Sequence, residues 1–212
     1  MKLYGYFRSS AAYRVRIALN LKRLDYDYVP VHLVMGEQRT DAYRVLNRQG
    51  LVPTLSDGDA VVTQSLAIIE YLDEVHPDPP LLPSPPAARA RVRAIALAIA
   101  CDIHPLDNLR VLRYLTRTLG VGEEAKDAWY RHWIELGLAA IEARLAADAA
   151  TAMFCHGDAP TLADVCLVPQ LANARRADMA LEPYPTLMRI DANCRALDAF
   201  AAAAPDRQPD AA

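Results

Sequence analysis

The sequence lacks the cysteine patterns that mark a disulfide scaffold, a redox dithiol or a metal site. Its 212 residues include four cysteines, and none stands in CxxC spacing or at metal-ligand spacing from a histidine. The four are Cys101, Cys155, Cys166 and Cys194, and such widely spaced cysteines suit a reducing compartment. We therefore expect no metal, no thioredoxin-type redox activity and a cytoplasmic location.

The sequence also lacks long apolar runs and a large excess of charge. Its longest apolar stretch, 94–101, is far shorter than the ~20 residues of a membrane-spanning helix, and no signal-peptide run separates Lys2 from Arg8. The formal net charge of -3 gives no general attraction to nucleic acid, so an anion site needs a local basic cluster. We expect neither a membrane nor a nucleic acid as a partner.

The first 78 residues alternate between strand and helix patterns, in a chain whose 53% hydrophobic content is typical of a globular protein. The patterns predict a strand at 2–7, a helix to Leu24 buried along one side, an edge strand at 26–33 containing Pro30, a short helix at 41–46 ended by Gly50, a hairpin turning at Asp57-Gly58, and a helix opened by Gln64-Ser65. This βαβ-ββα order predicts an α/β domain over residues 1–78.

Repeated prolines mark a break in composition, and we place a linker at 79–86 because prolines favour extended backbone. Residues 87–212 are alanine-rich and predict an all-helical domain, with helices at 92–119, 123–147, 162–173 and 184–200. Thr161 and Asp164 have the spacing of a capping box, which predicts the start of a buried helix. The small, polar tail from Ala204 is expected to be loosely held.

The stretch Arg8–Arg16 joins the first strand to the first helix and carries Ser9 and Ser10 at the corner. Unpaired N–H groups and the partial positive charge of a helix start favour an anion there. A lone serine pair at such a corner more often serves only as a helix cap. The corner is therefore a candidate anion site whose role depends on the rest of the chain.

The order of elements, with a Val-Pro turn, Gln-Ser at a helix start and a proline-rich linker, resembles the cytosolic glutathione transferases over nearly the whole chain. Residues 8–17, 64–72 and 168–174 are similar to zeta-class segments, the first to a double serine followed by Cys-x-Trp-Arg-Val-Arg. The resemblance implies a thioredoxin-like N-terminal domain, an all-α C-terminal domain and glutathione as cofactor. Zeta-class proteins include maleylacetoacetate isomerases and bacterial maleylpyruvate isomerases, and the latter resemble this chain most.

Two positions depart from the family pattern: Ala11 replaces the cysteine and Tyr13 the tryptophan. Because the family's isomerisation uses the thiol of glutathione itself, Ala11 removes only a role for a protein thiol at that position.

The resemblance assigns the glutathione site mainly to the N-terminal domain. Ser9 would hydrogen-bond the glutathione sulfur, with Ser10, Ala11 and the helix start beside it, which favours the thiolate. Val52, before a family cis proline at Pro53, would pair its backbone with the tripeptide. Further contacts are implied for Gln64 and Ser65 with the γ-glutamyl carboxylate, for Gln38 near the glycyl end, and for Asp102, His104 and Asn108.

The implied reaction adds the thiolate to the cis double bond of maleylpyruvate, and rotation followed by thiolate loss gives fumarylpyruvate. The carboxylates and the enolate need cations, and the family fold would bring Arg8, Arg110 and Arg176 to the pocket. Any one of them alone would more often be a solvated surface charge. His104 would be either a proton relay or a hydrogen-bond donor. We group these side chains with the serine pair as the catalytic set.

Other functions stay open at this stage: maleylacetoacetate isomerisation, glutathione conjugation or dehalogenation of small α-halo acids, and a non-catalytic module for assembly or ligand carriage. Loss of the sulfur-contacting hydroxyl would favour the non-catalytic module, but Ser9 is present. The resemblance also implies a homodimer in which Asp102 reaches the partner subunit's glutathione, and the apolar surfaces near 66–72 and 94–100 need cover.

Overall fold

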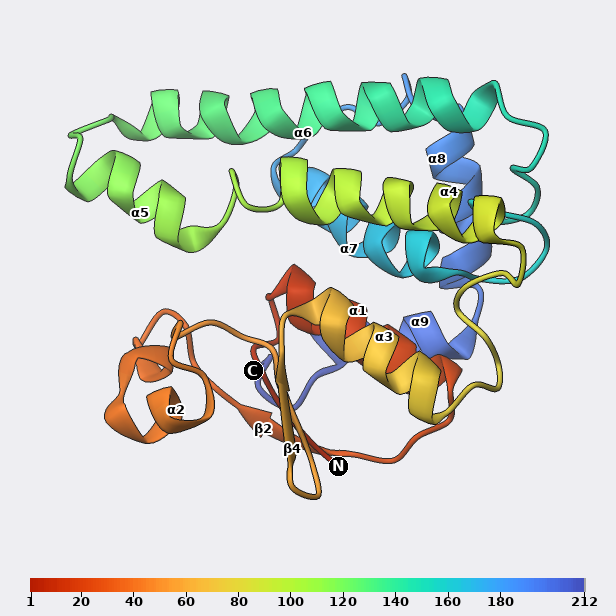
Figure 1. The fold of residues 1–212 in the computed structure, drawn as a ribbon. Coiled ribbons are helices and arrows are strands. Elements are labelled where there is room, and N and C mark those ends of the chain that lie inside the picture. The colour runs from red at the N-terminus through yellow and green to blue at the C-terminus, as the bar shows by residue number, and fades with distance from the viewer. Residues whose placement is uncertain (212) are drawn as a thin grey trace. The chain divides into compact units, whose positions relative to one another are not determined.

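The computed structural model describes residues 1–211, and its contacts divide the chain into two units (Figure 1). The first unit contains Met1–Leu81 and the chain from Arg195 onward, and the second contains Leu82–Cys194. The sequence pattern assigns everything from residue 87 to the helical domain, whereas the structure groups the C-terminal segment with the first unit.

The first unit is built on a four-stranded sheet of order β2-β1-β3-β4. β1 (Lys2–Gly5) pairs in parallel with β2 (Asp27–Pro30), and β3 (Thr54–Asp57) pairs antiparallel with both β1 and β4 (Ala60–Thr63). β2 is an edge strand, as expected from Pro30, which has no N–H for a ladder. The predicted βαβ-ββα order is confirmed.

Helix α1 (Ser10–Leu21) is buried on more than the one side expected from its periodicity. Ser10 and every residue from Ala12 to Leu19 are buried. The helix packs beside α3 (Ser65–Val75) and also contacts α9 (Asp198–Ala203) (Figure 1). The C-terminal segment therefore covers a side of α1 that the sequence pattern leaves exposed.

Gly50 does not end the short helix that precedes it, contrary to expectation. That helix, α2 (Asp41–Leu46), is capped at its C-terminus by Asn47. Gly50 has a φ of 61°, and a Cβ there would lie 2.9 Å from the carbonyl oxygen of Gln38. Glycine is required because the loop approaches the backbone of the preceding 3-10 helix, η1 (Glu37–Arg39).

The hairpin between β3 and β4 turns one residue later than its sequence signal indicates. Asp57 pairs with Ala60, so Gly58 and Asp59 form the turn, and Gly58 has a φ of 56°. The Asp57 side chain accepts a hydrogen bond from the Tyr71 hydroxyl of α3 (3.0 Å).

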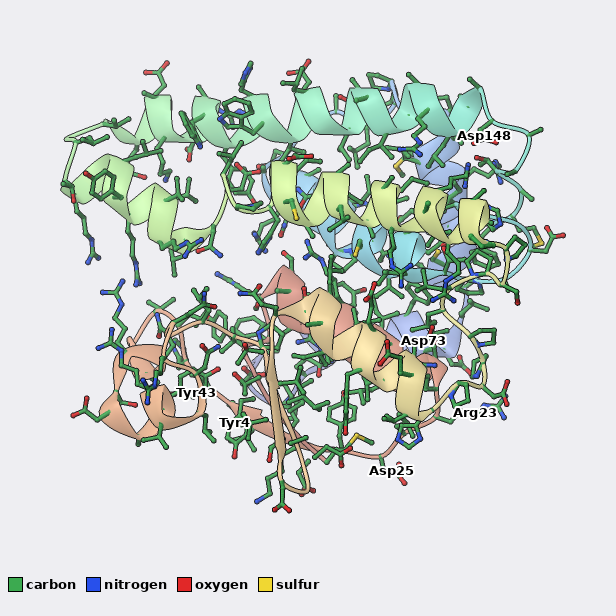
Figure 2. The ribbon with its side chains drawn as sticks, in the orientation of Figure 1. Tyr4, Arg23, Asp25, Tyr43, Asp73 and Asp148 are labelled. Carbon is green, nitrogen blue, oxygen red and sulfur yellow. The ribbon has the colours of Figure 1, made fainter. Side chains whose placement is uncertain are left out.

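A buried lysine holds the segment after α3, where the first stretch of this unit ends. Nζ of Lys22, just after α1, donates to Oδ1 of Asp73 (2.8 Å; Asp73 is labelled in Figure 2) and to the carbonyls of His76 (2.7 Å) and Pro79 (3.0 Å). The prolines that follow connect this unit to the helices of the second.

The second unit is built from helices: α4 (Pro86–Leu97), the π-helix η2 (Ala98–Ile103), α5 (Leu109–Arg117), α6 (Glu123–Ala146), α7 (Leu162–Arg176) and α8 (Pro185–Arg195). The expected single helix over 92–119 is wrong. The chain widens into η2 after Leu97 and leaves helical conformation around Pro105, which has no N–H to continue the ladder. Asn108 then caps α5.

Gly137 on α6 shows how closely η2 packs against its neighbour. A Cβ at this position would lie 2.2 Å from Cδ1 of Ile103, the last residue of η2. The buried Ile103 side chain therefore packs directly on the backbone of α6.

Helix α7 begins at the capping box that the sequence predicts. The Asp164 carboxylate accepts hydrogen bonds from the N–H and O–H of Thr161 (both 2.8 Å) and from the N–H of Cys155 (2.8 Å). Burial raises the pKa of Asp164, and these donors oppose the shift. The prediction of a buried helix is confirmed.

The C-terminal segment differs from the expected helix at 184–200 and the loosely held tail. α8 ends at Arg195, Leu197 is extended, and α9 starts a separate helix that packs on α1. The 3-10 helix η3 (Pro205–Arg207) follows, and Asp210 is hydrogen-bonded to Phe7 of the β1–α1 loop. No helix within residues 1–211 is long and apolar enough to cross a bilayer.

Candidate active site

Ser9 is the N-cap of α1. Its Oγ accepts a hydrogen bond from the N–H of Ala12 (3.2 Å), and its own N–H donates to the carbonyl of Tyr6 (2.9 Å). The cap uses an acceptor position of the hydroxyl and leaves the O–H available as a donor. The capping role and the sulfur contact implied by the resemblance are therefore compatible.

The surroundings of Ser9 favour an anion. Ser10 is buried, Ala11 is half-buried, and the first turn of α1 contains no acidic residue that would compete at the helix start. Arg8 is exposed, with its guanidinium carbon 5.3 Å from the centre of the Phe7 ring. In the sequence, Ser9 therefore lies between an arginine and the positive end of a helix.

A second helix start in the same unit also combines a hydroxyl with a cation. Ser65, the first residue of α3, is buried, and its Oγ accepts a hydrogen bond from Nη1 of the buried Arg14 (3.3 Å). Gln64 precedes it with a φ of 71°, and its exposed side chain donates to Oε1 of Gln49 (2.8 Å). Arg14 carries positive charge from α1 to the start of α3, so the site suits a carboxylate.

Val52 offers backbone groups for pairing with an extended ligand. The Val52–Pro53 peptide bond is cis. The ladder between β1 and β3 begins only at Thr54, and the N–H and C=O of Val52 have no hydrogen-bond partner within residues 1–211.

Two residues that the sequence analysis did not single out hold this loop. The Tyr43 hydroxyl (2.7 Å) and Nδ2 of Asn47 (2.8 Å) donate to the carbonyl of Leu51, and both side chains also reach Oγ1 of Thr54 (3.0 and 3.4 Å). Burial raises the pKa of Tyr43, which keeps it a neutral donor. Its ring lies 6.3 Å from that of Tyr4; both are labelled in Figure 2.

Gln38 is buried on η1, and its Nε2 donates to the carbonyl of Leu33 (3.3 Å). Its Oε1 is buried without a hydrogen-bond partner in the described part of the chain. The atom left over is an acceptor, which fits a peptide N–H better than a carboxylate.

In the second unit, the π-helix carries the first of the predicted residues. Asp102 is exposed on η2, and His104 ends this element with its N–H donating to the carbonyl of Ile99 (2.9 Å). A π-turn displaces side chains relative to an α-helix and is frequent at functional sites. The π-turn therefore determines where the side chains of Asp102 and His104 point, just before Pro105.

Arg110 lies in the first turn of α5, which Asn108 caps through a hydrogen bond from the N–H of Arg110 to its Oδ1 (3.0 Å). The capping oxygen is thereby used, and the amide NH₂ of Asn108 remains a donor. The Arg110 side chain is exposed. Because a cation at a helix start adds to the positive end of the dipole, the pair favours a bound anion.

Arg176 ends α7 and is exposed, but its position is guided by two neighbours. Its Nη2 donates to Oδ1 of Asn173 (2.9 Å) and to the hydroxyl of Tyr130 (3.3 Å) on α6. Arg176 and Tyr130 line a cavity of about 320 Å³ within the second unit, together with Arg131. Lys126, Asp127 and Asp178 also line it, so cations and carboxylates are mixed there with a small excess of positive charge.

Asp107 is a buried titratable group that the sequence analysis did not assign. It is 7% exposed, and neither carboxylate oxygen has a hydrogen-bond partner within residues 1–211. Burial raises its pKa to about 7. Burial also raises the pKa of nearby Tyr130; Arg176 opposes that shift and Asp107 adds to it. No pattern in the sequence distinguishes an aspartate that becomes buried in this way from one in an exposed loop.

The structure connects some of the predicted site residues through hydrogen bonds and places others on separate elements. Arg14 joins the starts of α1 and α3, whereas Arg110 and Arg176 lie on different helices and only Arg176 lines the cavity. The described residues contain no group of three or more His, Cys, Asp or Glu arranged to hold a metal.

Family models match both parts of the chain: the glutathione S-transferase N-terminal domain over residues 3–80 and the C-terminal domain over residues 123–203. A Vibrio cholerae protein named "Probable maleylacetoacetate isomerase" is 54% identical over 211 residues, covering 99% of this chain and 97% of that protein.

Solved structures resemble the whole chain. A holo maleylpyruvate isomerase, described as a bacterial zeta-class glutathione S-transferase, is 50% identical with a TM-score of 0.98, and both chains are covered completely. A maleylacetoacetate isomerase from Methylobacterium extorquens AM1, with bound malonate and GSH, is 44% identical with a TM-score of 0.98 and the same full coverage.

Proposed function

Because the chain belongs to the glutathione S-transferase family, we propose that it is a glutathione-dependent cis–trans isomerase that converts maleylpyruvate to fumarylpyruvate. The observation that carries the proposal is the Ser9 hydroxyl, which caps α1 and still has its O–H to donate. The 50% identity to a maleylpyruvate isomerase over both full lengths supports it.

The residues of the first unit fit glutathione. The backbone of Val52 can pair with an extended tripeptide, because both of its polar groups lie outside the sheet ladder. Ser65, with Gln64 beside it and Arg14 behind it, suits the γ-glutamyl carboxylate. Gln38 offers an acceptor to a peptide N–H.

When bound, glutathione supplies a thiolate that adds to the double bond and leaves after rotation about the resulting single bond. Ser9 donates to the sulfur, and the start of α1 adds positive potential, so the anion is favoured over the thiol. Lowering a thiol pKa from about 8.5 by about 2 corresponds to ~2.7 kcal/mol, a reasonable demand on one hydroxyl and a helix terminus. Ser10 supports the same helix start, and Ala11 brings no competing thiol.

In this proposal the substrate carboxylates are bound by Arg8, Arg110 and Arg176, whose planar guanidinium groups accommodate a carboxylate with two hydrogen bonds. Arg176 is the best prepared of the three because Asn173 and Tyr130 already orient it. His104 and Asn108 supply donors near the reacting atoms. The relative that holds both malonate and GSH shows that a family member accommodates a dicarboxylate.

The test is the loss of maleylpyruvate absorbance on adding the protein, with and without glutathione. We expect rapid, catalytic loss only when glutathione is present, and fumarylpyruvate as the product. Glutathione consumption in proportion to substrate would point instead to conjugation, and no reaction would remove the proposed activity.

A second candidate, maleylacetoacetate isomerisation, is favoured by the 54% identity to the Vibrio cholerae relative. The two substrates are both dicarboxylates and differ at one end, where maleylacetoacetate has one more methylene before its carboxylate. Comparison of kcat/KM for both compounds under the same conditions decides between them, and we expect maleylpyruvate to be preferred.

We also propose a cytoplasmic homodimer, in which Asp102 reaches the partner subunit's glutathione. Sedimentation at micromolar protein concentration tests the assembly, and a monomer would contradict it.

A further inference from the structure

The C-terminal tail is bound to the loop that leads into Ser9. β1 ends at Gly5 and α1 begins at Ser10, so the loop between them has no ladder of its own. The Asp210 carboxylate accepts two hydrogen bonds through Oδ2, from the N–H of Phe7 (3.0 Å) and from the hydroxyl of Tyr28 on β2 (3.3 Å). Asp210 therefore ties Phe7 to the edge strand.

Arg16 holds the same residue from the other side. Its fully buried guanidinium donates through Nη2 to the carbonyl of Phe7 (3.1 Å) and through Nε to the carbonyl of Ala203 at the end of α9 (2.9 Å). Both backbone polar groups of Phe7 are thus engaged by charged side chains. One of these belongs to the C-terminal segment, and the other is itself bound to that segment.

The position of Phe7 affects both neighbours that the proposed function uses. The N–H of Ser9 closes a turn onto the carbonyl of Tyr6, so Phe7 and Arg8 are the two residues inside that turn. The Arg8 guanidinium also lies over the Phe7 ring. Movement of Phe7 would change the direction of Arg8 and the placement of the Ser9 hydroxyl at the helix start.

We propose that Asp210 is a positioning residue for the glutathione-activating corner, acting from the C-terminal tail through Phe7 on Ser9 and Arg8. The inference rests on the proposed function for its catalytic consequence but not for the contact itself. A second C-terminal anchor, the hydrogen bond from Nδ2 of Asn20 to the carbonyl of Ala199 (3.0 Å), keeps α9 on α1 without Asp210. Loss of the Asp210 carboxylate should therefore release the loop and leave the fold in place.

The test compares Asp210→Ala with Asp206→Ala, which removes the same charge from an exposed position of the same tail. Hydrogen–deuterium exchange of the Phe7 amide in the full chain should accelerate at least tenfold in Asp210→Ala and stay unchanged in Asp206→Ala. Titration of the thiolate absorbance of bound glutathione should give a higher thiol pKa only in Asp210→Ala, with kcat lowered about tenfold and the KM for glutathione within about twofold. Asp210→Asn, which keeps an acceptor oxygen, should recover much of the loss.

Equal Phe7 exchange in the two alanine variants would overturn the contact. Faster exchange with an unchanged thiol titration and kcat would overturn the positioning role. If Asp210→Ala unfolds, Tyr28→Phe removes one of the two donors to Asp210 and should produce a smaller change in the same direction. If the natural protein does not isomerise maleylpyruvate, the proposed function fails, while the exchange and the thiol titration still decide this inference.

Discussion

The two units present their proposed ligand-binding groups in different ways. In the first unit these are hydroxyl groups on short side chains and backbone groups, and each is held in place by a hydrogen bond. Ser9 caps a helix, Ser65 accepts from Arg14, and Tyr43 donates to the loop that contains Val52. In the second unit, Arg110 and Arg176 are long and exposed. Short groups on a fixed backbone suit an invariant cofactor, and long side chains adapt to a substrate whose shape changes during rotation.

This difference predicts how each side responds to substitution. Removal of a short group on fixed backbone cannot be compensated by a neighbour, because no other donor can move into its place. An exposed arginine is partly replaced by water and by nearby cations, so its loss should be more graded.

The largest effect is expected for Ser9→Ala. Loss of the donor to the developing thiolate should lower kcat about a hundredfold or more, while the lost cap costs only ~1 kcal/mol of stability. Thiolate absorbance of the glutathione complex should titrate at higher pH. Ser9→Thr, which keeps a hydroxyl and the helix cap, is the matched control. An unchanged titration in Ser9→Ala would assign thiol activation to Ser10 or the helix start alone.

A smaller loss should follow from Arg176→Ala. Loss of a charge-assisted carboxylate contact should lower kcat/KM about thirtyfold, which corresponds to ~2 kcal/mol. Arg110→Ala should lower it less, about fivefold, because no side chain within residues 1–211 is hydrogen-bonded to the Arg110 guanidinium. Glutathione affinity should change in neither. Normal efficiency in either variant would remove that arginine from the site, and weaker glutathione binding would reassign it to the cofactor.

Asp107 tests whether a buried carboxylate of the second unit, which lacks a hydrogen-bond partner within residues 1–211, lowers the stability of the fold. Its pKa of about 7 in the fold, against about 3.9 when unfolded, means that between these pH values the folded protein holds a proton that the unfolded chain has lost. The free energy of unfolding should therefore fall as pH rises from about 4 to 7. Asp107→Asn should remove this part of the fall and stabilise the protein at pH 7.5 by about 1 to 2 kcal/mol.

The measurement is denaturant unfolding of Asp107→Asn and the natural protein at pH 5 and pH 7.5. Asp127→Asn, an exposed aspartate on α6, is the control. If the difference between Asp107→Asn and the natural protein is the same at both pH values, the carboxylate is ionised throughout and the prediction is wrong.

The same division separates what the sequence predicts well from what it predicts poorly. The four-stranded topology, the edge position of β2 and the Thr161–Asp164 cap follow from local signals: residue alternation, Pro30 and a capping box. The change to a π-helix after Leu97 and the separate α9 depend on contacts with distant residues, whereas Pro105 is a local signal for the end of the helix. Gly137 accommodates Ile103, and α1 provides the surface for α9, but periodicity near each break predicts a continuous helix.

The site shows the same pattern. Family motifs lead to Ser9, Val52 and Ser65, but their supporting residues come from distant positions without a local signature. Arg14 meets Ser65 across 51 residues, and Asp210 meets Phe7 across 203. Whether a residue in a loop or tail is bound by the rest of the chain depends on tertiary packing. The small, polar composition of the tail does not contain this information and therefore predicts a loose segment.

The smallest effect is expected for Ala11→Cys, which restores the family residue in the first turn of α1. Because the reacting thiol belongs to glutathione, kcat/KM should stay within about twofold. A cysteine near a helix start has a lowered pKa, so the new thiol should react quickly with iodoacetamide, and glutathione should protect it. Cys101 is the exposed native cysteine, so the measurement is made in a Cys101→Ser background. A several-fold rise in kcat/KM would show that a protein thiol contributes to catalysis, whereas rapid alkylation without glutathione protection would place residue 11 outside the cofactor site.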